Sequence, residues 1–223
     1  MLGVIFTGGE GPDSRLIKDQ LETETKDALF IAADSGLDAA EEAGIKPDWI
    51  IGDMDSIRVK ERISSYPAQR VLVYEHDKDF TDTELAFSLA EEKGCNEKWI
   101  IGGGGGRTDH LFGIRCLFER DLFPRRWITG AEDIRCIEAG KGEQGSGGEL
   151  RCNLEKGSIV SVFPLGTEPW EAVSAGLKWP LNKVKWSRGF FGLSNVAVDG
   201  FFSVNALNGR FMVIMPLPRI YGE

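Results

Sequence analysis

Two aspartates that lie two positions apart, Asp53 and Asp55, are the residues of this chain with the clearest chemical potential. They follow the apolar run Trp49-Ile50-Ile51 and Gly52, which is typical of a buried parallel strand. Two carboxylates so close together repel each other unless a positive charge lies between them. A divalent cation such as Mg²⁺ suits an all-oxygen site of this kind. The same pattern is also common as a solvated turn before a helix, which Ser56 is placed to cap.

A second acidic segment, DKDFTDTELA, covers residues 77–86 and contains Asp79 and Asp82. Thr81 and Glu84 match a capping box, which predicts that a helix starts there. A ligand role and a capping role are compatible, because both aspartates lie in the loop and first turn while the later apolar residues face the core. Asp79 and Asp82 are therefore candidates for metal or substrate binding.

A run of five glycines precedes the sequence Arg107-Thr108-Asp109-His110; its members are Gly102, Gly103, Gly104, Gly105 and Gly106. Glycine runs are common in flexible linkers, but this run lies between an apolar strand and an apolar helical pattern. Its backbone N–H groups, the helix N-terminus and Arg107 could together hold anionic oxygens. We therefore interpret the run as a phosphate cradle. It is not a P-loop, since no GK[ST] follows, and we take His110 as structural.

The composition limits the kinds of partner and location that are expected. Among 223 residues, 42% are hydrophobic and 27% are charged, as in folded globular proteins. The formal net charge of −9 argues against binding to nucleic acid or to an anionic membrane surface. The N-terminus lacks a signal-peptide pattern, and no apolar run reaches the roughly 18 residues of a membrane span. The cysteines, Cys95, Cys116, Cys136 and Cys152, have neither zinc-site nor disulfide-framework spacing, so we expect a cytoplasmic protein.

The elements that must position these residues alternate between strands and helices in the first half of the chain. Apolar runs predict strands at residues 2–6, 28–33, 49–51, 71–74 and 98–101. Helical patterns lie between them, including one capped by Asp13 or Ser14 that runs to about Leu21. This alternation predicts a mostly parallel α/β sheet covered on both faces. Ligands bind such sheets at the carboxyl ends of the strands, where Asp34 and the acidic segments fall.

The second half of the chain has a different pattern, with no convincing helix. Short strand-like runs, at residues 127–129, 134–138, 158–163, 171–174, 201–206 and 210–215, are separated by Gly, Pro and Asn turns. Such spacing predicts an all-β domain, a sandwich or jelly roll, that begins near residue 125. We therefore expect an α/β domain at residues 1–124 and a β-sandwich domain at residues 125–223, with an exposed hairpin loop at residues 140–148.

As a set, the segments ADSG, IIGDMDSI, DKDFTDTELA, GGGGGRTDH, GLKWPL and GLSN resemble the thiamine pyrophosphokinase family in order and approximate spacing. The resemblance covers nearly the whole chain. It implies a nucleotide-binding α/β domain, a C-terminal β-sandwich and a homodimer. It also implies Mg²⁺-dependent transfer of the diphosphoryl group of ATP to the hydroxyethyl oxygen of thiamine, which releases AMP. Two positions depart from the family pattern: Ser35 replaces the second glycine of ADGG, and Met54 replaces the Phe of GDFDS.

The resemblance further implies roles for individual residues. The magnesium ligands would be Asp53, Asp55, Asp79 and Asp82, and these together with Arg107 form the catalytic set. The residues that contact ATP would be Asp34, Gly102, Gly103, Gly104, Gly105, Gly106, Arg107 and Asp109. The residues on the thiamine side would be Trp179, Ser194 and Asn195. An aromatic face suits a flat cation such as thiazolium, although Trp179 could equally be one of several core tryptophans.

The sequence leaves open some further questions about mechanism. Diphosphoryl transfer depends mainly on positioning and charge neutralisation, so a general base is optional. A carboxylate of the loop from Asp79 to Asp82 is the candidate for that base. Because the acidic end of the sheet offers few aromatic groups, we expect thiamine to bind between the two domains. The homodimer that the resemblance implies would complete this site with its second subunit.

Two other functions compete with diphosphoryl transfer. An aspartyl-phosphate phosphohydrolase also has a strand that leads into Asp-x-Asp-Ser, with Asp53 as the nucleophile. That activity accounts for neither the segment GGGGGRTDH nor the β domain. A non-catalytic protein that binds a nucleotide or thiamine as a regulator is the other alternative.

Overall fold

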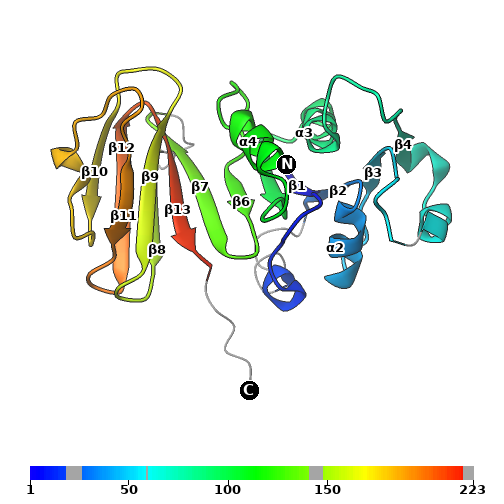
Figure 1. Ribbon diagram of the computed structural model, residues 1–223, viewed down its shortest axis with the longest axis horizontal. Coiled ribbons are helices and arrows are strands. Elements are labelled where there is room, and N and C mark those ends of the chain that lie inside the picture. Colours follow the sequence, from blue (N-terminus) through cyan, green and yellow to red (C-terminus); the bar gives the residue numbers. More distant parts are fainter. Residues whose placement is uncertain (19–26, 59, 141–147, 218–223) are drawn as a thin grey trace. The chain divides into compact units, whose positions relative to one another are not determined.

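The computed structural model describes residues 1–18, 27–58, 60–140 and 148–217 (Figure 1). The chain divides into two compact units, Met1–Ala131 and Glu132–Glu223. In the described part of the chain, no helix is both long enough and apolar enough to cross a membrane.

The N-terminal unit is built on a parallel sheet whose strands lie in the order β6-β5-β1-β2-β3-β4. The strands are β1 (Leu2–Phe6), β2 (Leu29–Ala33), β3 (Trp49–Gly52), β4 (Val71–Val73), β5 (Glu97–Ile101) and β6 (Arg126–Ile128). Their order reverses at β1, which pairs with both β2 and β5. In open α/β sheets, the carboxyl ends of the strands at such a reversal form the ligand crevice.

Helices cover both faces of this sheet: α2 (Gly36–Glu42) and α3 (Asp82–Glu92) lie on opposite sides of it in Figure 1. Val4 and Phe6 pack with Ala40 of α2, whereas the space next to Gly3 is bounded by Ala90 of α3. Alternate residues of β1 therefore face the two helices, as the pleat of a strand requires. The predicted mostly parallel α/β sheet is confirmed.

Other helical segments of this unit are shorter or only partly described. The helix α4 (Thr108–Leu117) follows the glycine run. The 3₁₀ helices η1 (Lys60–Ser65) and η2 (Ala68–Arg70) connect β3 to β4, so the helix predicted to start near Ile57 is wrong. Residues 14–18 are helical, and the rest of the helix predicted to run to Leu21 lies outside the described residues.

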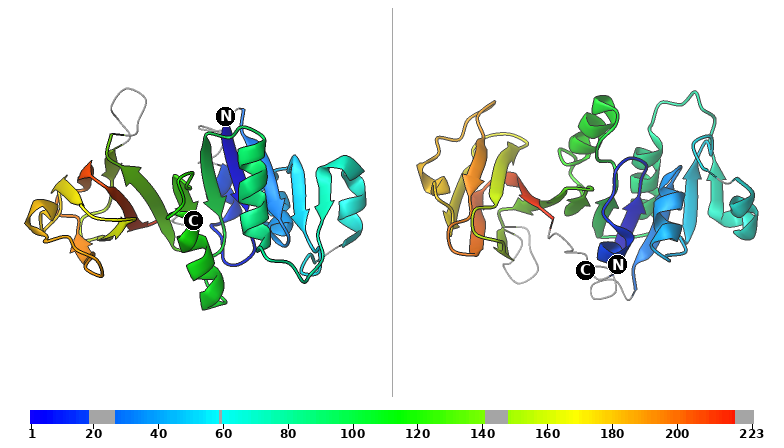
Figure 2. Two further views of the ribbon diagram at one scale, coloured as in Figure 1. Left: turned by 90° about the horizontal axis from the view of Figure 1, so that it is seen from above. Right: turned by 60° about the horizontal axis from the view of Figure 1, so that its bottom comes forward.

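The C-terminal unit contains two antiparallel layers, in the strand orders β11-β9-β13-β7 and β10-β12-β8 (Figure 2). The strands are β7 (Glu132–Glu138), β8 (Glu149–Asn153), β9 (Ile159–Leu165), β10 (Glu171–Ala175), β11 (Gly192–Val196), β12 (Phe201–Asn208) and β13 (Arg210–Pro216). Val162 of β9, Val204 of β12 and Phe211 of β13 meet in one buried cluster. Because side chains of both layers form this core, the unit is a β-sandwich, as predicted.

The strand β6 belongs to the N-terminal unit, whereas the sequence analysis assigned residues 127–129 to the second domain. Its residues are buried, and it pairs in parallel with β5. The division between the units accordingly comes after Ala131 rather than after residue 124. Short apolar strands of parallel and antiparallel sheets have similar sequences, so the sequence alone did not distinguish them. Most of the predicted hairpin loop at residues 140–148 lies outside the described residues.

Candidate active site

Three carboxylates meet at the carboxyl ends of β2 and β3 and the start of α3: those of Asp34, Asp53 and Asp82. One oxygen atom from each lies within 4.8 Å of the other two. The Asp34 N–H donates a hydrogen bond to the Ile51 carbonyl, at 2.9 Å, which continues the pairing of β2 with β3. We call Asp34, Asp53 and Asp82 the carboxylate cluster.

The capping box predicted from the sequence fixes the third member of the carboxylate cluster. The Thr81 hydroxyl accepts a hydrogen bond from the Glu84 N–H, and the Glu84 carboxylate accepts one from the Thr81 N–H. The Thr83 hydroxyl lies 2.6 Å from that of Thr7, at the end of β1. These bonds hold the N-terminus of α3, and with it Asp82, against the sheet.

Gly52 lies between the members of the carboxylate cluster. A Cβ at this position would lie 3.1 Å from the Asp82 carboxyl carbon and 3.2 Å from the Asp34 Cβ, and its φ is +145°. Few L-residues adopt that conformation, so both the backbone and the space favour glycine here. From the sequence, Gly52 is predicted only to end a strand. Its position directly before an acidic pair was the available signal of a role in the site.

Asp34 is the electrostatically strained member of the carboxylate cluster. Its φ of +47° is unusual for a residue with a side chain. Its Oδ1 atom is buried and accepts no hydrogen bond from the described residues. Burial raises the pKa of Asp34 above its ordinary value; hydrogen bonds from Ser35 and Ser56 oppose this, and the charges of Asp82 and Asp53 add to it. A bound cation would relieve both the unpaired oxygen and the repulsion.

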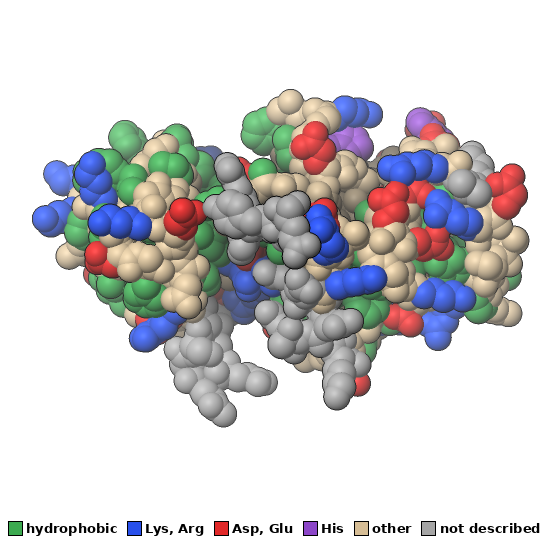
Figure 3. Space-filling view, turned by 90° about the horizontal axis from the view of Figure 1, so that it is seen from below, with side chains coloured by type: hydrophobic (Ala, Val, Ile, Leu, Met, Phe, Trp, Pro, Cys, Tyr) green, Lys and Arg blue, Asp and Glu red, His purple; other side chains and the backbone are tan. Residues whose placement is uncertain are grey.

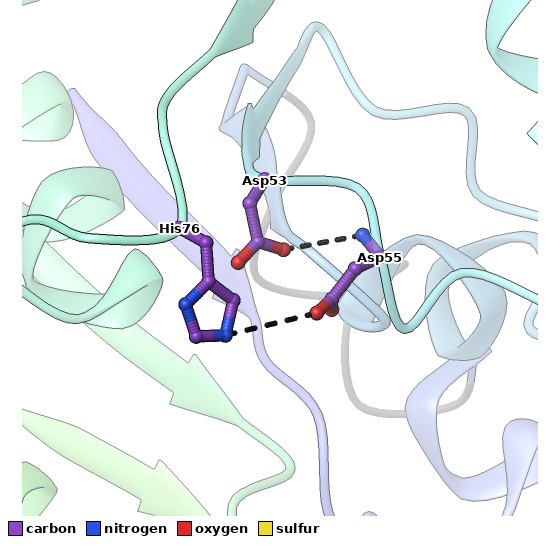
Figure 4. Close-up of side chains that lie close together, drawn as sticks. All are labelled: Asp53, Asp55 and His76. Carbon is purple, nitrogen blue, oxygen red and sulfur yellow. Dashed lines mark hydrogen bonds and ion pairs between the residues drawn. The ribbon is translucent and has the colours of Figure 1, made fainter.

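Asp55 lies in a second group of possible ligands with Asp53 and His76 (Figure 4). The chain is not extended between the two aspartates, because Met54 has a φ of +62° and the Asp55 N–H donates to Asp53 Oδ1 at 3.1 Å. The Nε2 atom of His76 lies 4.0 Å from Asp55 Oδ2. Met54 itself is buried in the core, so the departure from the family pattern at this position still gives a packed turn.

Lys78 contacts two members of the carboxylate cluster, a role that its sequence context does not predict. Its Nζ atom lies 3.0 Å from Asp82 Oδ1 and 3.8 Å from Asp53 Oδ2, and its side chain is only 15% exposed. The signal in the sequence was a single lysine between Asp77 and Asp79, four residues before Asp82.

The other acidic candidate from this segment, Asp79, lies apart from these contacts. Among the described residues, neither group of possible metal ligands includes Asp79, and its side chain is exposed. The structure thus brings Asp53 and Asp82 together with Asp34, which the family resemblance had placed on ATP, and leaves Asp79 outside.

The loop that carries Asp53 and Asp55 is anchored to α2 by charged side chains. Arg62 forms ion pairs with Asp38 and with Glu41, the latter at 2.6 Å. The Tyr66 hydroxyl donates a hydrogen bond to the Glu41 carboxylate at 2.8 Å. These contacts fix the far end of the loop, so the acidic turn is held at both ends.

The glycine run after β5 is shaped mainly by backbone packing. The N–H groups of Gly102, Gly103 and Gly104 donate to the carbonyls of Ile128, Gly8 and Glu10, each at 2.9 Å. A Cβ at Gly102 would come within 2.3 Å of the Thr7 carbonyl oxygen. The run is glycine-rich because the loops after β1 and β5 touch backbone to backbone. The interpretation of these three N–H groups as a phosphate cradle is therefore wrong; Gly105 and Gly106 are exposed.

Arg107 and Asp109 form an exposed ion pair at the start of α4. Arg107 Nε lies 3.1 Å from Asp109 Oδ1, and Nη2 lies 2.6 Å from Oδ2. Hydrogen bonds from Arg107 lower the pKa of Asp109. An anionic ligand at Arg107 would have to replace this carboxylate or share the guanidinium group with it.

A pocket of about 320 Å³ adjoins the carboxylate cluster. The loop after β1 and the helix α2 line it, together with Ser35, Ser56 and Arg58. The same two serines donate hydrogen bonds to the Asp34 carboxylate, so they connect the pocket to the carboxylate cluster. Arg58 is exposed and pairs with Glu42 at 2.7 Å. The pocket therefore offers polar groups and one adaptable cation beside a set of possible metal ligands.

In the C-terminal unit, Trp179 is 52% exposed, which excludes the core position considered in the sequence analysis. Asn195 is buried and binds the backbone of Trp179: its Oδ1 accepts from the Trp179 N–H at 3.0 Å, and its Nδ2 donates to the Trp179 carbonyl at 2.6 Å. The Asn195 amide thus positions Trp179, rather than facing a ligand. Ser194 is exposed, and its N–H donates to the Ser161 hydroxyl at 3.2 Å.

Large apolar side chains are exposed along β11 and the segments next to it. Phe190, Phe191 and Leu193 are 65%, 47% and 53% exposed, and β11 is an edge strand whose one partner strand among the described residues is β9. Figure 3 shows one face of the molecule, with exposed hydrophobic side chains over the C-terminal unit and mixed acidic and basic side chains over the N-terminal unit. We call Trp179, Phe190, Phe191 and Leu193 the β11 patch.

Comparison with known proteins places these features in a family context. A family model described as "Thiamin pyrophosphokinase, catalytic domain" matches residues 21–121. The chain is 31% identical over 179 residues to thiamine pyrophosphokinase of Bacillus subtilis, an alignment that covers 77% of this chain and 79% of that protein.

Solved structures give the same result for the whole fold. The crystal structure of the Bacillus subtilis thiamine pyrophosphokinase superposes with a TM-score of 0.74 and 27% identity, covering 98% of this chain and all of that one. The enzyme from Geobacillus thermodenitrificans gives 0.73 and 25%, covering 99% of each chain. These matches support neither a phosphohydrolase nor a non-catalytic regulator.

Proposed function

The chain belongs to the thiamine pyrophosphokinase family, and on that premise we propose that it transfers the diphosphoryl group of ATP to thiamine. The products are thiamine diphosphate and AMP. The carboxylate cluster beside the polar pocket is the observation that carries the proposal, because phosphoryl chemistry of this kind depends on charge neutralisation and positioning.

The donor set of the cluster suits Mg²⁺. Asp34, Asp53 and Asp82 offer hard oxygen ligands, and the unpaired buried Oδ1 of Asp34 lacks only a positive partner. Asp55, on the turn that follows Asp53, is the next ligand outward. A bound Mg²⁺ would neutralise negative charge on the phosphates as the bond between the α- and β-phosphates breaks. We propose that Asp79 contacts the substrate and does not bind the metal ion.

We place ATP in the pocket between the loop after β1 and α2. The Gly8 and Gly9 backbone allows close approach of the nucleotide, and Arg58 can turn from Glu42 toward a phosphate. We also assign the exposed backbone of Gly105 and Gly106 and the guanidinium group of Arg107 to the binding of the phosphate chain. Positioning by these groups holds the diphosphoryl group in line with the attacking oxygen.

The proton of the thiamine hydroxyl needs an acceptor only late in the reaction. Asp82 already faces Lys78 and the carboxylate cluster, whereas Asp79 is exposed in the same loop. We therefore assign the role of proton acceptor to Asp79.

The thiamine side of the reaction belongs to the C-terminal unit. The exposed indole of Trp179 offers a flat surface for a cationic ring. The Lys178 Nζ atom lies 4.6 Å from the centroid of this indole, so the ring already interacts with one cation. We propose that the β11 patch is covered by a second subunit in a homodimer, because an edge strand with exposed large apolar groups favours association. Substitution Leu193→Lys should convert a dimer to a monomer in light scattering; a wild-type monomer would remove this part of the proposal.

We propose a cytoplasmic location, because the four cysteines have neither the spacing of a disulfide framework nor that of a zinc site.

The decisive experiment is an incubation with ATP, Mg²⁺ and thiamine, followed by chromatography of the nucleotides and thiamine esters. We expect AMP and thiamine diphosphate in equal amounts, and neither with EDTA or without thiamine. Asp53→Asn should abolish both products, while Asp199→Asn, a matched change at an exposed aspartate, should not. An acyl-phosphate trapped on Asp53 would indicate a phosphohydrolase, and tight thiamine binding without turnover would indicate a regulator.

A further inference from the structure

Among the described residues, Lys78 is a cationic side chain that contacts two members of the carboxylate cluster, Asp53 and Asp82. Its ammonium group lies 3.0 Å from Asp82 Oδ1 and 3.8 Å from Asp53 Oδ2, and it also donates to the Glu75 carbonyl at 3.2 Å. The side chain is mostly covered, at 15% exposure, and so are those of Asp53 and Asp82, at 13% and 23%. This burial separates Lys78 from an ordinary surface ion pair, which contributes little.

The position of the Lys78 ammonium matters because it contacts the oxygens that a divalent cation needs. Asp82 Oδ1 and Asp53 Oδ2 cannot keep the lysine ammonium at 3.0 Å and 3.8 Å and bind a metal ion at the same time, since two positive charges would then be a few ångströms apart. Lys78 lies on the loop between β4 and α3, and its long side chain can turn away without any change in the strands.

We propose that Lys78 is an internal counter-ion of the carboxylate cluster, which competes with a divalent cation for Asp53 and Asp82 and is displaced when that cation binds. The inference deepens the proposed function, because it assigns a role in metal loading to a residue of the same site. As a consequence, Lys78 lowers the affinity of the carboxylate cluster for the bare cation. It also reduces the repulsion between the carboxylates when no cation is bound.

The competition predicts the effect of removing the charge. Lys78→Met keeps the length of the side chain but eliminates the ammonium group, so a divalent cation no longer has to displace it. We expect the variant to bind Mn²⁺ about tenfold more tightly than the wild-type protein, measured by the electron paramagnetic resonance signal of free Mn²⁺ in the absence of nucleotide. Lys78→Arg, which keeps the charge, should bind Mn²⁺ within about twofold of the wild type.

Two further measurements make the result specific. Lys156→Met changes the net charge by the same amount at an exposed lysine of the C-terminal unit, and it should leave Mn²⁺ affinity unchanged. In EDTA, Lys78→Met should melt below the wild type, because the three carboxylates then repel one another without compensation. Added Mn²⁺ should raise its melting temperature by more than it raises that of the wild type.

The outcomes separate this inference from the proposed function. Equal or weaker Mn²⁺ binding by a folded Lys78→Met protein would overturn the counter-ion role, even if thiamine diphosphate is formed. Tighter binding supports that role even if thiamine is not the acceptor. If neither protein binds Mn²⁺, the metal site fails, and with it both the counter-ion role and the metal-dependent part of the function.

Discussion

Two regions of the molecule hold side chains in environments that are unfavourable for them. They are the carboxylate cluster of the N-terminal unit and the β11 patch of the C-terminal unit, and they differ in how the cost is offset. In the carboxylate cluster, acidic side chains lie in partly buried positions, and Lys78 from the same chain offsets part of the charge of Asp53 and Asp82. In the β11 patch, large apolar side chains remain exposed at an edge strand. The first region has a partial counter-charge within one chain, whereas the second needs a ligand or a second subunit to cover it.

The largest expected effect comes from breaking the carboxylate cluster at its shared member. Asp53 contributes to both groups of possible ligands, so Asp53→Asn should lower the turnover rate by about 10²- to 10³-fold while the fold remains intact. Steady-state kinetics over a range of Mg²⁺ concentrations, with thermal unfolding as the check on folding, measures this. Near-wild-type activity at low Mg²⁺ would refute a metal role for Asp53.

A second test alters the space between the carboxylates without removing a charge. In Gly52→Ala the new methyl group meets the Asp82 carboxyl carbon and the Asp34 side chain, and the backbone conformation is unfavourable for alanine. We expect a stability loss of about 1 to 3 kcal/mol in chemical denaturation, together with weaker Mn²⁺ binding. Gly94→Ala is the matched control: its φ is also positive, but a Cβ there meets nothing within 4 Å. If both variants lose Mn²⁺ affinity equally, strain alone explains the effect.

The C-terminal region is tested by loosening the support of its exposed tryptophan. Asn195→Ala leaves the partly buried N–H and carbonyl groups of Trp179 without their side-chain partner, which should cost about 1 to 3 kcal/mol of stability. We also expect KM for thiamine to rise while KM for ATP stays near the wild-type value. Asn195→Asp has nearly the same shape as the wild type. It keeps the acceptor for the Trp179 N–H but loses the donor to the Trp179 carbonyl. Equal changes in KM for both substrates would show that Asn195 supports the fold in general.

Removing the indole itself should have a smaller effect, confined to one substrate. Because Trp179 is half exposed, Trp179→Ala should leave the melting temperature nearly unchanged. The loss of an aromatic face should weaken thiamine binding by about 0.5 to 2 kcal/mol in calorimetry. Phe201→Ala, a change at another exposed aromatic residue, is the control. Unaltered thiamine affinity in Trp179→Ala would remove this residue from the substrate site.

The two regions also differ in how much of them the sequence predicts. The α/β sheet, the β-sandwich and the capping box at Thr81 follow from local patterns, because periodicity and capping depend on neighbouring residues. The roles of Gly52, Lys78 and Asn195 depend on which segments meet in space, so sequence spacing gave no direct measure of them.

The glycine run is another feature whose contacts the sequence alone does not predict. Its composition predicts a cradle for anionic oxygens, but the N–H groups of Gly103 and Gly104 donate to the chain's own loop after β1. Whether a glycine N–H faces a phosphate or a carbonyl depends on the packing of two strands, β1 and β5, that are far apart in the sequence.

The smallest effect is expected at Arg107, an exposed residue of the N-terminal unit. The guanidinium group is well exposed and already paired with Asp109, so water and that carboxylate screen any interaction with phosphate. Arg107→Ala should raise KM for ATP about threefold to tenfold and lower kcat modestly, with little change in stability. Asp109→Asn provides the matched test, because it frees Arg107 for the phosphate chain and should lower KM for ATP. If Arg107→Ala instead reduces stability and leaves the response to ATP unchanged, Arg107 serves the start of α4 and not the nucleotide.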